Sequence, residues 1–479
     1  MRPDAKTIFL TVTFGTNVRD ILRGNVLKVL KASGHRIVIL SPIHDDPAFR
    51  AEFESDNVIV EPLHPHRPSR LERKVNSLRF TLFPDLCETF RILTRPVARR
   101  SAVKAALARC VLAFVRLIGR ANTRRLVMWL NTYLFPDRHH ADLFRRYKPD
   151  LVCVTEFFHL ASDLWILKRA VRERIPTVGL VRSWDNLTTK GSFPAPIDRL
   201  VVWSETMRRE AVEMHGYRPE EVFVGGVPQY DAYTDPTEFP TRGDFFRRIG
   251  ADPGKRLITW ALVPKDRFPE EMDIAAELGK LIHAGALGEP AQLLIRLYPL
   301  RASTVPDHLQ GQPSALFDLP GTPSRFPDRN ISLDDLRHLA ATMRYSDVVI
   351  NMASTISVDA AAMGTPVVCV AFEGEEPKPY HESVQKHYDM THFRRILTSG
   401  GVRVARNMPD LIEHVQTYLR HPQLDADGRR RIVETECYRL DGRAGERIAN
   451  FILQRLEEVT GGERQNRVVQ LTGETVGAR

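Results

Sequence analysis

The stretch from Ser346 to Cys369 carries the side chains with the clearest chemistry. It begins with a predicted strand over Val348–Asn351, and small polar residues then start a short helix. A helix N-terminus offers free backbone N–H groups and the positive end of the helix dipole, which together suit a diphosphate. Ser354 and Thr355 are therefore predicted to bind phosphate, and Asp359, one turn later, to hold the ribose hydroxyls of a nucleotide. The alternative is a capped helix without a ligand, because Ser and Thr are common helix caps.

Two series of alternating strands and helices would position these residues. The first begins with strand Ile8–Thr13 and helix Val18–Lys31, and the second begins with strand Arg256–Leu262. Such alternation predicts parallel sheets covered by helices. Two αβα domains of this kind leave a cleft at the carboxyl ends of their strands, where ligands bind. We predict an N-terminal acceptor domain over 1–235, a C-terminal nucleotide-donor domain over 236–440, a final helix over 441–460 and a disordered tail over 461–479.

The turn after the first strand, Phe14-Gly15-Thr16-Asn17, differs from a dinucleotide-binding loop. It has one glycine where the Gly-x-Gly-x-x-Gly pattern has three, so a dinucleotide cofactor is not supported. Gly15 is nevertheless included among the predicted donor contacts.

Basic residues are concentrated in one part of the chain. The 479 residues include 68 Lys+Arg and 59 Asp+Glu, a net charge of +9, and residues 70–125 alone hold 14 basic and 3 acidic residues. This stretch belongs to a predicted helical insertion over about 70–135. Its basic stripe opposes an apolar face, a pattern typical of helices that dock on an anionic membrane. The alternative is a helix packed on its own domain with solvated arginines. The stripe consists of Arg109, Arg116, Arg120 and Arg124.

The composition gives no support to several other classes of function. The five cysteines are scattered, and no group of His, Cys or acidic residues has metal-ligand spacing, so we predict no metal site, no disulfide framework and no cofactor. No nucleic-acid-binding motif is present. No run of about 18 uncharged apolar residues could span a bilayer. We expect a cytoplasmic protein that associates peripherally with the inner face of the membrane.

Three segments resemble one group of enzymes. The run from Ser354-Thr355 through Asp359 to Gly364-Thr-Pro366 resembles the donor-binding helix of GT-B glycosyltransferases, especially bacterial enzymes that build surface polysaccharides or teichoic-type polymers. Val224–Asp231 resembles the Gly-x-Pro-x-x-Asp segment of the CDP-glycerol glycerophosphotransferase-like group, and Asp441–Ile448 resembles the start of the final helix in many such enzymes. The resemblance implies an α/β GT-B fold, with two Rossmann-like αβα domains facing a central cleft, and a transfer reaction that needs no metal ion.

The resemblance also implies that the catalytic base comes from the N-terminal domain. Transfer to a hydroxyl group needs a side chain that accepts its proton. Asp185 and Glu156 both follow predicted strands and are the preferred candidates, with Asp20 third. Their structural alternatives are a turn, a helix cap and an ion pair with a neighbouring arginine. Trp184, beside Asp185, offers a flat surface for a sugar to stack on.

The positive charge that neutralises the donor phosphate must come from a different position than in many related transferases. Related transferases often carry His-Pro after a strand of the C-terminal domain, whereas this chain has Tyr298-Pro299. Arg296 or Arg301 is predicted to neutralise the phosphate instead, because a guanidinium group suits bidentate contacts with phosphate oxygens. Lys265, in the loop after the preceding strand, is a further candidate. Glu373, in an acidic loop, is predicted to bind the donor sugar, and a solvated loop is the alternative.

Together these patterns predict a glycosyltransferase that moves a sugar from a nucleotide-sugar donor to a lipid-linked or polysaccharide acceptor in cell-surface polysaccharide synthesis. One alternative is a CDP-glycerol-type polyol-phosphate transferase, which would release CMP rather than a nucleoside diphosphate. The others are a UDP-GlcNAc 2-epimerase-like enzyme, which would need no acceptor, and a non-catalytic scaffold of the same fold.

Overall fold

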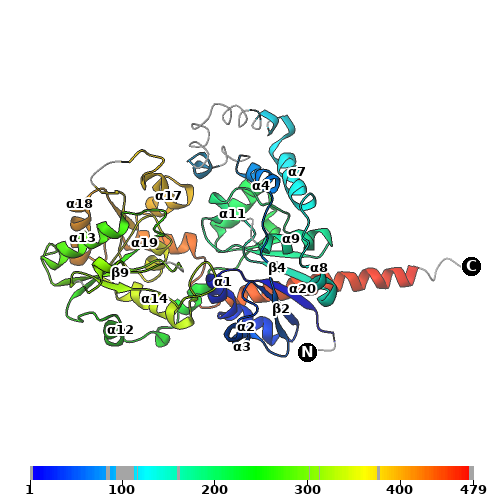
Figure 1. Cartoon of the computed structure of the whole chain (residues 1–479), viewed down its shortest axis with the longest axis horizontal. Helices are drawn as coiled ribbons and strands as arrows, with labels where there is room; N and C mark the ends of the chain where they lie inside the picture. Colours follow the sequence, from blue (N-terminus) through cyan, green and yellow to red (C-terminus); the bar gives the residue numbers. More distant parts are fainter. Residues whose placement is uncertain are drawn as a thin grey trace, which may run out of the picture.

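The chain forms two parallel β-sheets, each covered by helices (Figure 1). The computed structural model describes residues 4–81, 87–92, 110, 113–115, 117–158, 162–300, 303–311, 313–374 and 378–473. Strand partners in both sheets run parallel, as in β1 with β4 and β8 with β11. Parallel strands need long crossover connections, and the helices between the strands supply them.

Seven strands form the N-terminal sheet, in the order β3-β2-β1-β4-β5-β6-β7. Strands β1, β4 and β5 are buried over their whole length, as expected for strands with helices on both faces. The order reverses between β1 and β4, which is the position where such sheets bind ligands. The strands are β1 (Thr7–Thr11), β2 (Arg36–Ser41), β3 (Val58–Pro62), β4 (Leu151–Val154), β5 (Thr177–Leu180), β6 (Arg199–Val202) and β7 (Val222–Val224).

Six strands form the C-terminal sheet, in the order β10-β9-β8-β11-β12-β13. The order reverses between β8 and β11, so this sheet has a second ligand-binding position of the same kind. The strands are β8 (Arg256–Ala261), β9 (Ala291–Arg296), β10 (Leu316–Asp318), β11 (Val348–Asn351), β12 (Val367–Val370) and β13 (Val402–Ala405).

Helices connect and cover the strands of both sheets. Those up to residue 233 are α1 (Gly15–Asn17), η1 (Val18–Leu22), α2 (Asn25–Ala32), α3 (Pro47–Phe53), α4 (Arg70–Thr81), α7 (Arg120–Tyr133), α8 (Ala141–Tyr147), α9 (Ser162–Arg172), α10 (Asn186–Thr189), α11 (Glu205–His215), η2 (Pro219–Glu221) and η3 (Pro228–Tyr233). Those that follow are η4 (Pro236–Glu238), α12 (Arg242–Ile249), α13 (Glu271–His283), η5 (Asp307–Leu309), α14 (Leu333–Tyr345), α15 (Ile356–Ala362), α16 (Gln385–Tyr388), α17 (Thr391–Thr398), α18 (Met408–Arg420), α19 (Ala426–Glu436) and α20 (Ala444–Gly473).

The predicted helix Val18–Lys31 is in fact two elements. The π-helix η1 ends before Gly24, and α2 begins after it. A Cβ at Gly24 would lie 3.0 Å from the carbonyl oxygen of Asp20, so this close approach favours glycine. The π-helix carries Arg19 and Asp20, and π-helical turns are frequent at functional sites.

Two of the segments that resemble known transferases meet in the structure. Asp231, in η3, accepts hydrogen bonds from the backbone N–H groups of Ala444 and Gly445, both at 2.8 Å. These are the first residues of α20, where a carboxylate satisfies free N–H groups and interacts favourably with the helix dipole. Helix α20 thereby returns from the C-terminal sheet and packs against α2 (Figure 1). It continues to Gly473, past the predicted end at residue 460.

The predicted fold class, two Rossmann-like domains facing a central cleft in a GT-B arrangement, is confirmed by the two sheets and their order. In the predicted insertion the described helices are α4 and α7, whereas residues 93–109 lie outside the described residues. Among the helices that the structure describes, none combines the length and the apolar character needed to cross a bilayer.

Candidate active site

A central cleft separates the carboxyl ends of the two sheets. It is a cavity of about 430 Å³, within the range of about 300–1,000 Å³ typical of ligand pockets. Asp20 and Asp185 line it on the N-terminal side, and Arg267, Arg296 and Thr355 line it on the C-terminal side. Predicted donor and base residues from distant parts of the chain therefore share one cavity.

The turn after β11 places Ser354 and Thr355 on the C-terminal wall. Ala353 has a left-handed φ of 44°, a conformation that costs a non-glycine residue energy and clusters at ligand sites. The side-chain oxygen of Asn351 accepts the N–H of Ser354 at 3.1 Å. The hydroxyl of Thr355 accepts a hydrogen bond from Nε1 of Trp184 at 3.0 Å, across the cleft. This bond joins the predicted donor segment to the segment of the predicted base.

Trp184 has a different role from the one its ring suggested. Only 2% of its surface is exposed, and its ring meets that of His392 edge-on at 5.1 Å. The side chain thus packs between the two halves of the molecule rather than offering an open face to a sugar.

Asp359 lies on α15 and is buried. Its Oδ1 accepts the hydroxyl of Tyr233 at 2.7 Å. Burial raises the pKa of Asp359 to about 6, against the hydrogen bond from Tyr233 and the charge of Arg19, which lower it. A ribose would have to displace Tyr233 to reach Oδ1, and the ribose-binding role stays a prediction.

Two cationic side chains in the cleft form no salt bridge among the described residues, although the charge of one of them, Lys190, lowers the pKa of Asp185. They are Lys190, which follows α10, and Arg267, in the loop after β8. By contrast, Arg296 is 7% exposed and ion-paired with Asp318, and the exposed Lys265 is not one of the described residues that line the cleft. Sequence analysis did not assign Lys190 or Arg267, although both follow strands whose carboxyl ends face the cleft.

Asp185 is held as an ionised carboxylate. It accepts hydrogen bonds from the hydroxyl of Ser183 at 2.5 Å, the side-chain amide of Asn186 at 3.2 Å and the hydroxyl of Thr189 at 3.1 Å. Burial raises the pKa of Asp185, but the charges of His392 and Lys190 and the hydrogen bonds from Ser183 and Thr189 outweigh it, so the pKa lies below its ordinary value. The carboxylate is therefore ready to accept a proton, at the cost of some basicity.

The other two predicted bases are each paired with an arginine. Asp20 receives two hydrogen bonds from Arg19, at 2.5 and 3.0 Å, and lines the cleft. Glu156 is buried and forms an ion pair with Arg182 at 3.2 Å. Arg182 lines the cleft, whereas Glu156 lies behind it. Of the three carboxylates, Asp185 thus has the fewest charged neighbours in direct contact.

One end of the cleft is closed by a segment that we call the strap, residues 319–331. The carboxylate of Asp328 accepts the N–H groups of Gly15 and Thr16 at 2.7 and 3.0 Å. A Cβ on Gly15 would lie 2.3 Å from the carbonyl oxygen of Arg329, so the approach of the two backbones requires glycine here. In this structure Gly15 therefore contacts the strap, and sequence analysis missed the strap because its partner lies more than 300 residues away.

The strap is also anchored by apolar packing. Phe326 is 2% exposed and packs with Phe49 in the hydrophobic core of the N-terminal domain, with the two ring centroids 6.5 Å apart. Arg23 donates hydrogen bonds to the side chain of Asn330 at 2.6 Å and to the carbonyl of Ile331 at 2.7 Å. This end of the cleft is therefore held by both polar and apolar contacts.

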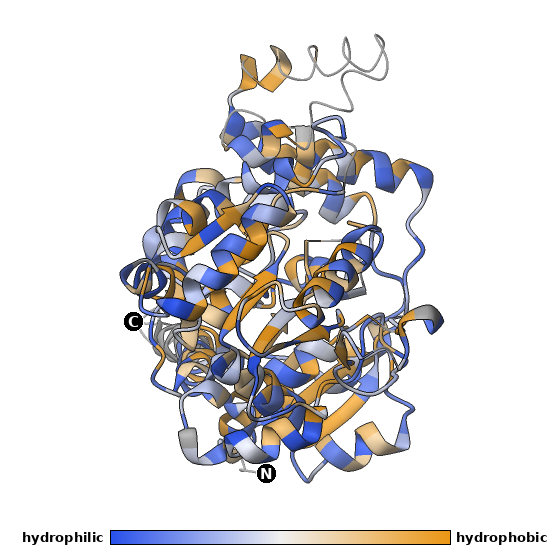
Figure 2. Ribbon diagram, turned by 90° about the vertical axis from the view of Figure 1, so that its left-hand side faces the viewer, coloured by the Kyte–Doolittle hydropathy of each residue, from blue (hydrophilic) through white to orange (hydrophobic). Residues whose placement is uncertain are grey.

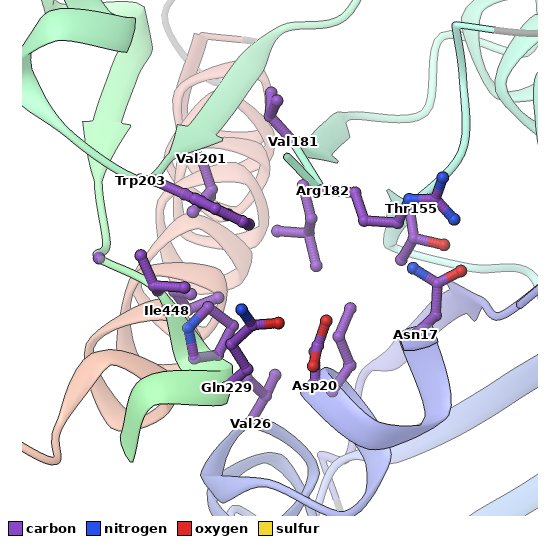
Figure 3. A pocket seen from close by; sticks show the side chains of 15 residues that line it. Asn17, Asp20, Val26, Thr155, Val181, Arg182, Val201, Trp203, Gln229 and Ile448 are labelled. Carbon is purple, nitrogen blue, oxygen red and sulfur yellow. The ribbon is translucent and has the colours of Figure 1, made fainter. Parts of the chain in front are cut away.

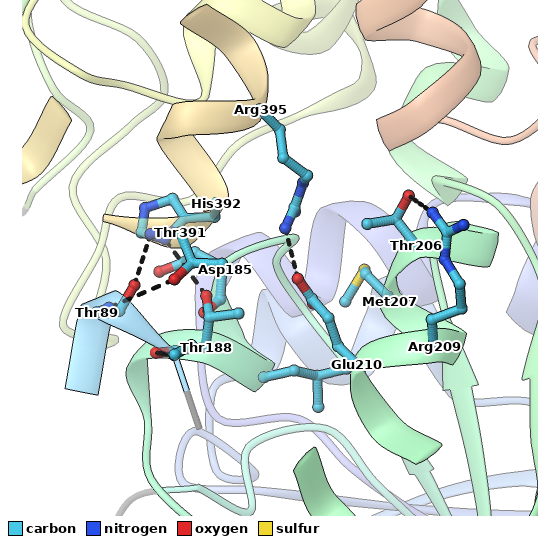
Figure 4. Close-up of polar contacts among 12 residues, drawn as sticks. Thr89, Asp185, Thr188, Thr206, Met207, Arg209, Glu210, Thr391, His392 and Arg395 are labelled. Carbon is cyan, nitrogen blue, oxygen red and sulfur yellow. Dashed lines mark hydrogen bonds and ion pairs between the residues drawn. The ribbon is translucent and has the colours of Figure 1, made fainter. Parts of the chain in front are cut away.

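Helix α17 closes the other end of the cleft (Figure 4). His392 faces the hydroxyl of Thr188 at 3.3 Å. Burial lowers the pKa of His392 to about 4, with Asp185 acting against it and Arg395, Arg267 and Lys190 adding to it. The imidazole is thus neutral near pH 7. The charges of Lys190 and Arg267 both lower the pKa of His392, so the two charges lie in the same region of the cleft.

Three further contacts secure α17. Thr391 donates its backbone N–H to the hydroxyl of Thr89 at 2.8 Å. Arg395 forms an ion pair with Glu210 of α11 at 2.5 Å (Figure 4). It forms a second ion pair with Glu436 of α19 at 2.8 Å. Burial raises the pKa of Glu210 to about 7, against the charge of Arg395. This interface therefore contains a carboxylate that titrates near neutral pH.

A much smaller cavity lies behind the cleft in the N-terminal domain (Figure 3). It measures about 30 Å³ and shares Asp20, Arg182, Trp203 and Gln229 with the cleft. Figure 3 shows the polar ends of Asp20 and Gln229 pointing into it. A cavity of this size holds one or two water molecules. It is too small for a sugar or a nucleotide.

The remaining predicted residues lie elsewhere. The carboxylate of Glu373 accepts the N–H of Val384 near the start of α16, and Glu373 is not among the described residues that line the cleft. Arg120 is exposed at the start of α7, whereas the guanidinium of Arg124 lies against Gly216 and its pKa is lowered by burial. Arg109 and Arg116 lie outside the described residues, as does Arg301. The described part of the predicted stripe therefore does not share one exposed face.

Within the described part of the chain, no three His, Cys, Asp or Glu side chains are grouped as a metal ion would require. The prediction of a metal-independent reaction stays a prediction.

Solved structures with the same fold include three sugar-nucleotide proteins. The S. aureus MnaA–UDP structure has a TM-score of 0.53 and 13% identity, covering 94% of this chain and 97% of that one. The UDP-GlcNAc 2-epimerase from Neisseria meningitidis bound to UDP-GlcNAc has a TM-score of 0.50 and 12% identity, covering 94% and 100%. The Methanocaldococcus jannaschii UDP-GlcNAc 2-epimerase in complex with UDP-GlcNAc and UDP has a TM-score of 0.50 and 11% identity, covering 94% and 99%. At these identities the likeness shows the fold alone.

The family is shown by the sequence match. No curated protein matches the chain. A family model described as CDP-glycerol:poly(glycerophosphate) glycerophosphotransferase matches residues 193–454, which is more than half of the 479 residues. The matched region contains Asp231, the donor segment at Ser354 and Thr355, and the start of α20. The chain belongs to the CDP-glycerol:poly(glycerophosphate) glycerophosphotransferase family.

Proposed function

We propose that the protein transfers a polyol phosphate from a CDP-activated donor to a hydroxyl group of a lipid-linked or polymeric acceptor in cell-surface polymer synthesis. Membership of the family identifies a transferase of the glycosyl or polyol-phosphate kind, and the family description favours the polyol phosphate. A nucleotide-sugar donor is the second candidate, because proteins of the same fold are solved with UDP and UDP-GlcNAc.

The observation that carries the proposal is the hydrogen bond between Trp184 and Thr355 at 3.0 Å. It joins the residue before Asp185 to Thr355, and Asp185, Ser354 and Thr355 all line the same cleft. Lys190 and Arg267, which line the same cavity, supply positive charge for phosphate oxygens. A base, phosphate-binding hydroxyls and unpaired cations are the groups that a phosphoryl or glycosyl transfer requires.

In the proposed reaction, an acceptor hydroxyl oxygen attacks the distal phosphorus of the CDP-polyol. A new O–P bond forms, the P–O bond to CMP breaks, and the hydroxyl proton passes to Asp185. Lys190, Arg267 and the hydroxyl groups stabilise the charge on the departing CMP phosphate. With a nucleotide sugar, the same oxygen would attack the anomeric carbon and a nucleoside diphosphate would leave. No step uses a metal ion, so activity is proposed to survive EDTA.

A thermal-shift panel tests the donor site. CMP, CDP-glycerol, UDP, UDP-GlcNAc and GDP are each added to the full-length protein. A ligand at about 100 times its Kd stabilises the fold by about 2.7 kcal/mol, and we expect the cytidine nucleotides to give the largest shift. Lys190→Ala combined with Arg267→Ala should reduce that shift, whereas Arg247→Ala, an exposed arginine of α12, should not. A protein that no nucleotide stabilises would be a non-catalytic scaffold and would contradict the proposal.

We also propose that the protein works in the cytoplasm, at the anionic inner face of a membrane, where a lipid-linked acceptor resides. Support comes from the 14 basic and 3 acidic residues between 70 and 125. Basic residues close to an anionic leaflet contribute about 1 kcal/mol each to binding.

A further inference from the structure

Exposed apolar side chains are concentrated in one part of the molecule. Of the twelve large apolar side chains exposed in the described chain, eight lie between Leu71 and Leu134. Monomeric proteins rarely gather exposed apolar groups in one region without a function for them. The eight are Leu71, Phe114, Leu117, Ile118, Leu126, Trp129, Tyr133 and Leu134. The helices that carry them project from the top of the molecule in Figure 2, where hydrophobic residues alternate with hydrophilic ones.

A buried polar network fixes which faces of α4 and α7 turn inward. Lys168 of α9 is fully buried and lies 3.3 Å from the carboxylate of Glu72 on α4 and 3.5 Å from the side-chain oxygen of Asn131 on α7. Asn131 also donates to the side chain of Asn76 at 3.3 Å. Buried groups of this kind are costly to leave unpaired. The two helices are therefore held in one orientation, and their opposite faces stay exposed.

The outer face of α7 is apolar and aromatic. Leu126, Trp129 and Tyr133 are spaced three and four residues apart and so share one side of the helix. They are 40%, 53% and 44% exposed. The rings of Trp129 and Tyr133 are 5.6 Å apart. Trp and Tyr rings favour the boundary between water and lipid, where one end is apolar and the other polar.

The exposed charges of the described chain segment that carries this face have a single sign. Among the described residues from 66 to 139, no exposed side chain is acidic, because Glu72 and Asp137 are buried and Glu88 is only partly exposed. The exposed basic side chains in the same stretch are Arg67, Arg70, Arg73, Lys74, Arg91, Arg120, Arg125 and Arg138. A one-signed basic surface around an apolar stripe matches the headgroups and acyl boundary of an anionic leaflet.

We infer that the outer face of α4 and α7, which we call the lipid-facing surface, docks on an anionic bilayer by inserting Leu126, Trp129 and Tyr133 between the headgroups. The inference rests on the proposed function, because the lipid-linked acceptor of that function lies at the membrane surface. The residues inferred to bind the membrane differ from the arginine stripe predicted from the sequence, because Arg124 of that stripe packs inward. Apolar insertion provides the depth of binding, and the surrounding arginines provide the preference for anionic lipid.

Trp129 makes the docking directly observable. The other four tryptophans, Trp165, Trp184, Trp203 and Trp260, are at most 7% exposed. Full-length protein is mixed with vesicles of phosphatidylcholine, with and without phosphatidylglycerol, carrying brominated acyl chains. We expect a blue shift and quenching of tryptophan emission only when phosphatidylglycerol is present. Trp129→Phe should abolish the spectral change while the protein still sediments with the vesicles.

Variants distinguish the contribution of apolar insertion to vesicle binding from that of electrostatic attraction. Leu126→Ser combined with Trp129→Ser should weaken vesicle binding by about tenfold or more, because two apolar side chains no longer leave water. Arg125→Glu should reduce the preference for phosphatidylglycerol. The matched controls are Leu424→Ser and Arg247→Ala, an exposed leucine and an exposed arginine far from this face, and both should bind like the wild type.

Two results would overturn the inference. One is wild-type emission that brominated anionic vesicles leave unquenched. The other is a blue shift of Trp129 that grows with protein concentration in the absence of lipid, which would assign the surface to a second copy of the chain. Nucleotide binding is measured without vesicles and should be unchanged in Leu126→Ser. A protein that docks but binds no nucleotide would contradict the proposed function and leave this inference standing.

Discussion

Both walls of the cleft present charged side chains, but the two base candidates that line it lie on the N-terminal wall and the predicted phosphate-binding hydroxyl groups lie on the C-terminal wall. Asp20 and Asp185 belong to the first wall, and Thr355, Arg267 and Arg296 belong to the second. Carboxylates accept protons from an attacking hydroxyl group, and hydroxyls and cations bind phosphate. The proposed function therefore assigns the base to one wall and most of the phosphate contacts to the other, with Lys190 of the N-terminal wall adding to the phosphate contacts.

The base candidates Asp20 and Asp185 are held by contacts within their own half, and contacts between the halves set the separation of the two walls. Asp20 pairs with Arg19 and Asp185 with hydroxyl groups of its own loop. The contacts between the halves include Trp184 with Thr355 and Gly15 with Asp328. The two walls can therefore be altered independently of each other, and their spacing can be altered through the crossing contacts.

The largest expected effect comes from the base on the N-terminal wall. Asp185→Asn keeps the shape of the side chain but cannot accept the proton, so kcat should fall by about 10²–10⁴. Nucleotide binding, which is proposed to use mainly the other wall, should stay within about twofold of the wild type. Asp20→Asn serves as the matched variant on the same wall. A larger loss of kcat in Asp20→Asn than in Asp185→Asn would indicate that Asp20, and not Asp185, is the base.

The spacing between the walls should respond to Gly15→Ala. The new Cβ would lie 2.3 Å from the carbonyl oxygen of Arg329, and relieving that overlap costs about 1–3 kcal/mol. Because this protein is large, we expect a fall in Tm of several degrees, measured by scanning calorimetry. Gly243→Ala in α12 is the control, since its Cβ would meet nothing closer than 3.9 Å. Equal Tm values for the two variants would mean that the strap does not hold the walls together.

A smaller effect is expected on the C-terminal wall. Thr355→Ala removes the hydroxyl that Trp184 contacts and that the donor phosphate is proposed to bind. Loss of one hydrogen bond costs about 0.5–1.5 kcal/mol, so nucleotide affinity should fall roughly two- to tenfold. Isothermal titration calorimetry measures this directly. Thr398→Ala, which removes an exposed hydroxyl of α17 outside the cleft, should leave the affinity unchanged.

The smallest effect concerns pH at the α17 end. Burial raises the pKa of Glu210 to about 7 from a usual value of 4.5, against the charge of Arg395 and with help from Glu436 and Asp185. The folded protein thus binds this proton more tightly than the unfolded chain does. Its contribution to stability is complete below about pH 4.5 and is lost as the pH rises through about 7.

The Tm should therefore decrease between pH 6 and pH 8, and Glu210→Gln should flatten that decrease. Glu205→Gln, an exposed residue of the same helix, should follow the wild-type curve. The strap end uses the backbone N–H groups of Gly15 and Thr16, which do not titrate in this range. A wild-type pH dependence retained in Glu210→Gln would assign the titration to another group.

The local sequence pattern of apolar and polar residues was enough to predict the two parallel sheets and the cleft between them. Apolar runs such as Val348–Asn351, followed by small polar residues, mark a strand that ends at a ligand site. The same reasoning placed Asp185 and Thr355 at the cleft, because both follow strand carboxyl ends. These predictions need only the order of elements and the geometry of parallel sheets.

Contacts between distant segments could not be predicted in this way. The pairing of Gly15 with Asp328 joins residues far apart in sequence, and neither has a neighbour that signals the other. The burial of Trp184 against Thr355 and the inward position of Arg124 likewise depend on how the domains and the insertion pack. Helical periodicity identified an amphipathic basic segment but could not show which face packs on the domain.

Nucleotide release tests the central claim most directly. The full-length protein is incubated with a poly(glycerol phosphate) acceptor and either CDP-glycerol or UDP-GlcNAc, and the released nucleotide is quantified by chromatography. The proposed function predicts release of CMP from CDP-glycerol that depends on the acceptor and is lost in Asp185→Asn. Release of UDP from UDP-GlcNAc, with CDP-glycerol left intact, would contradict it.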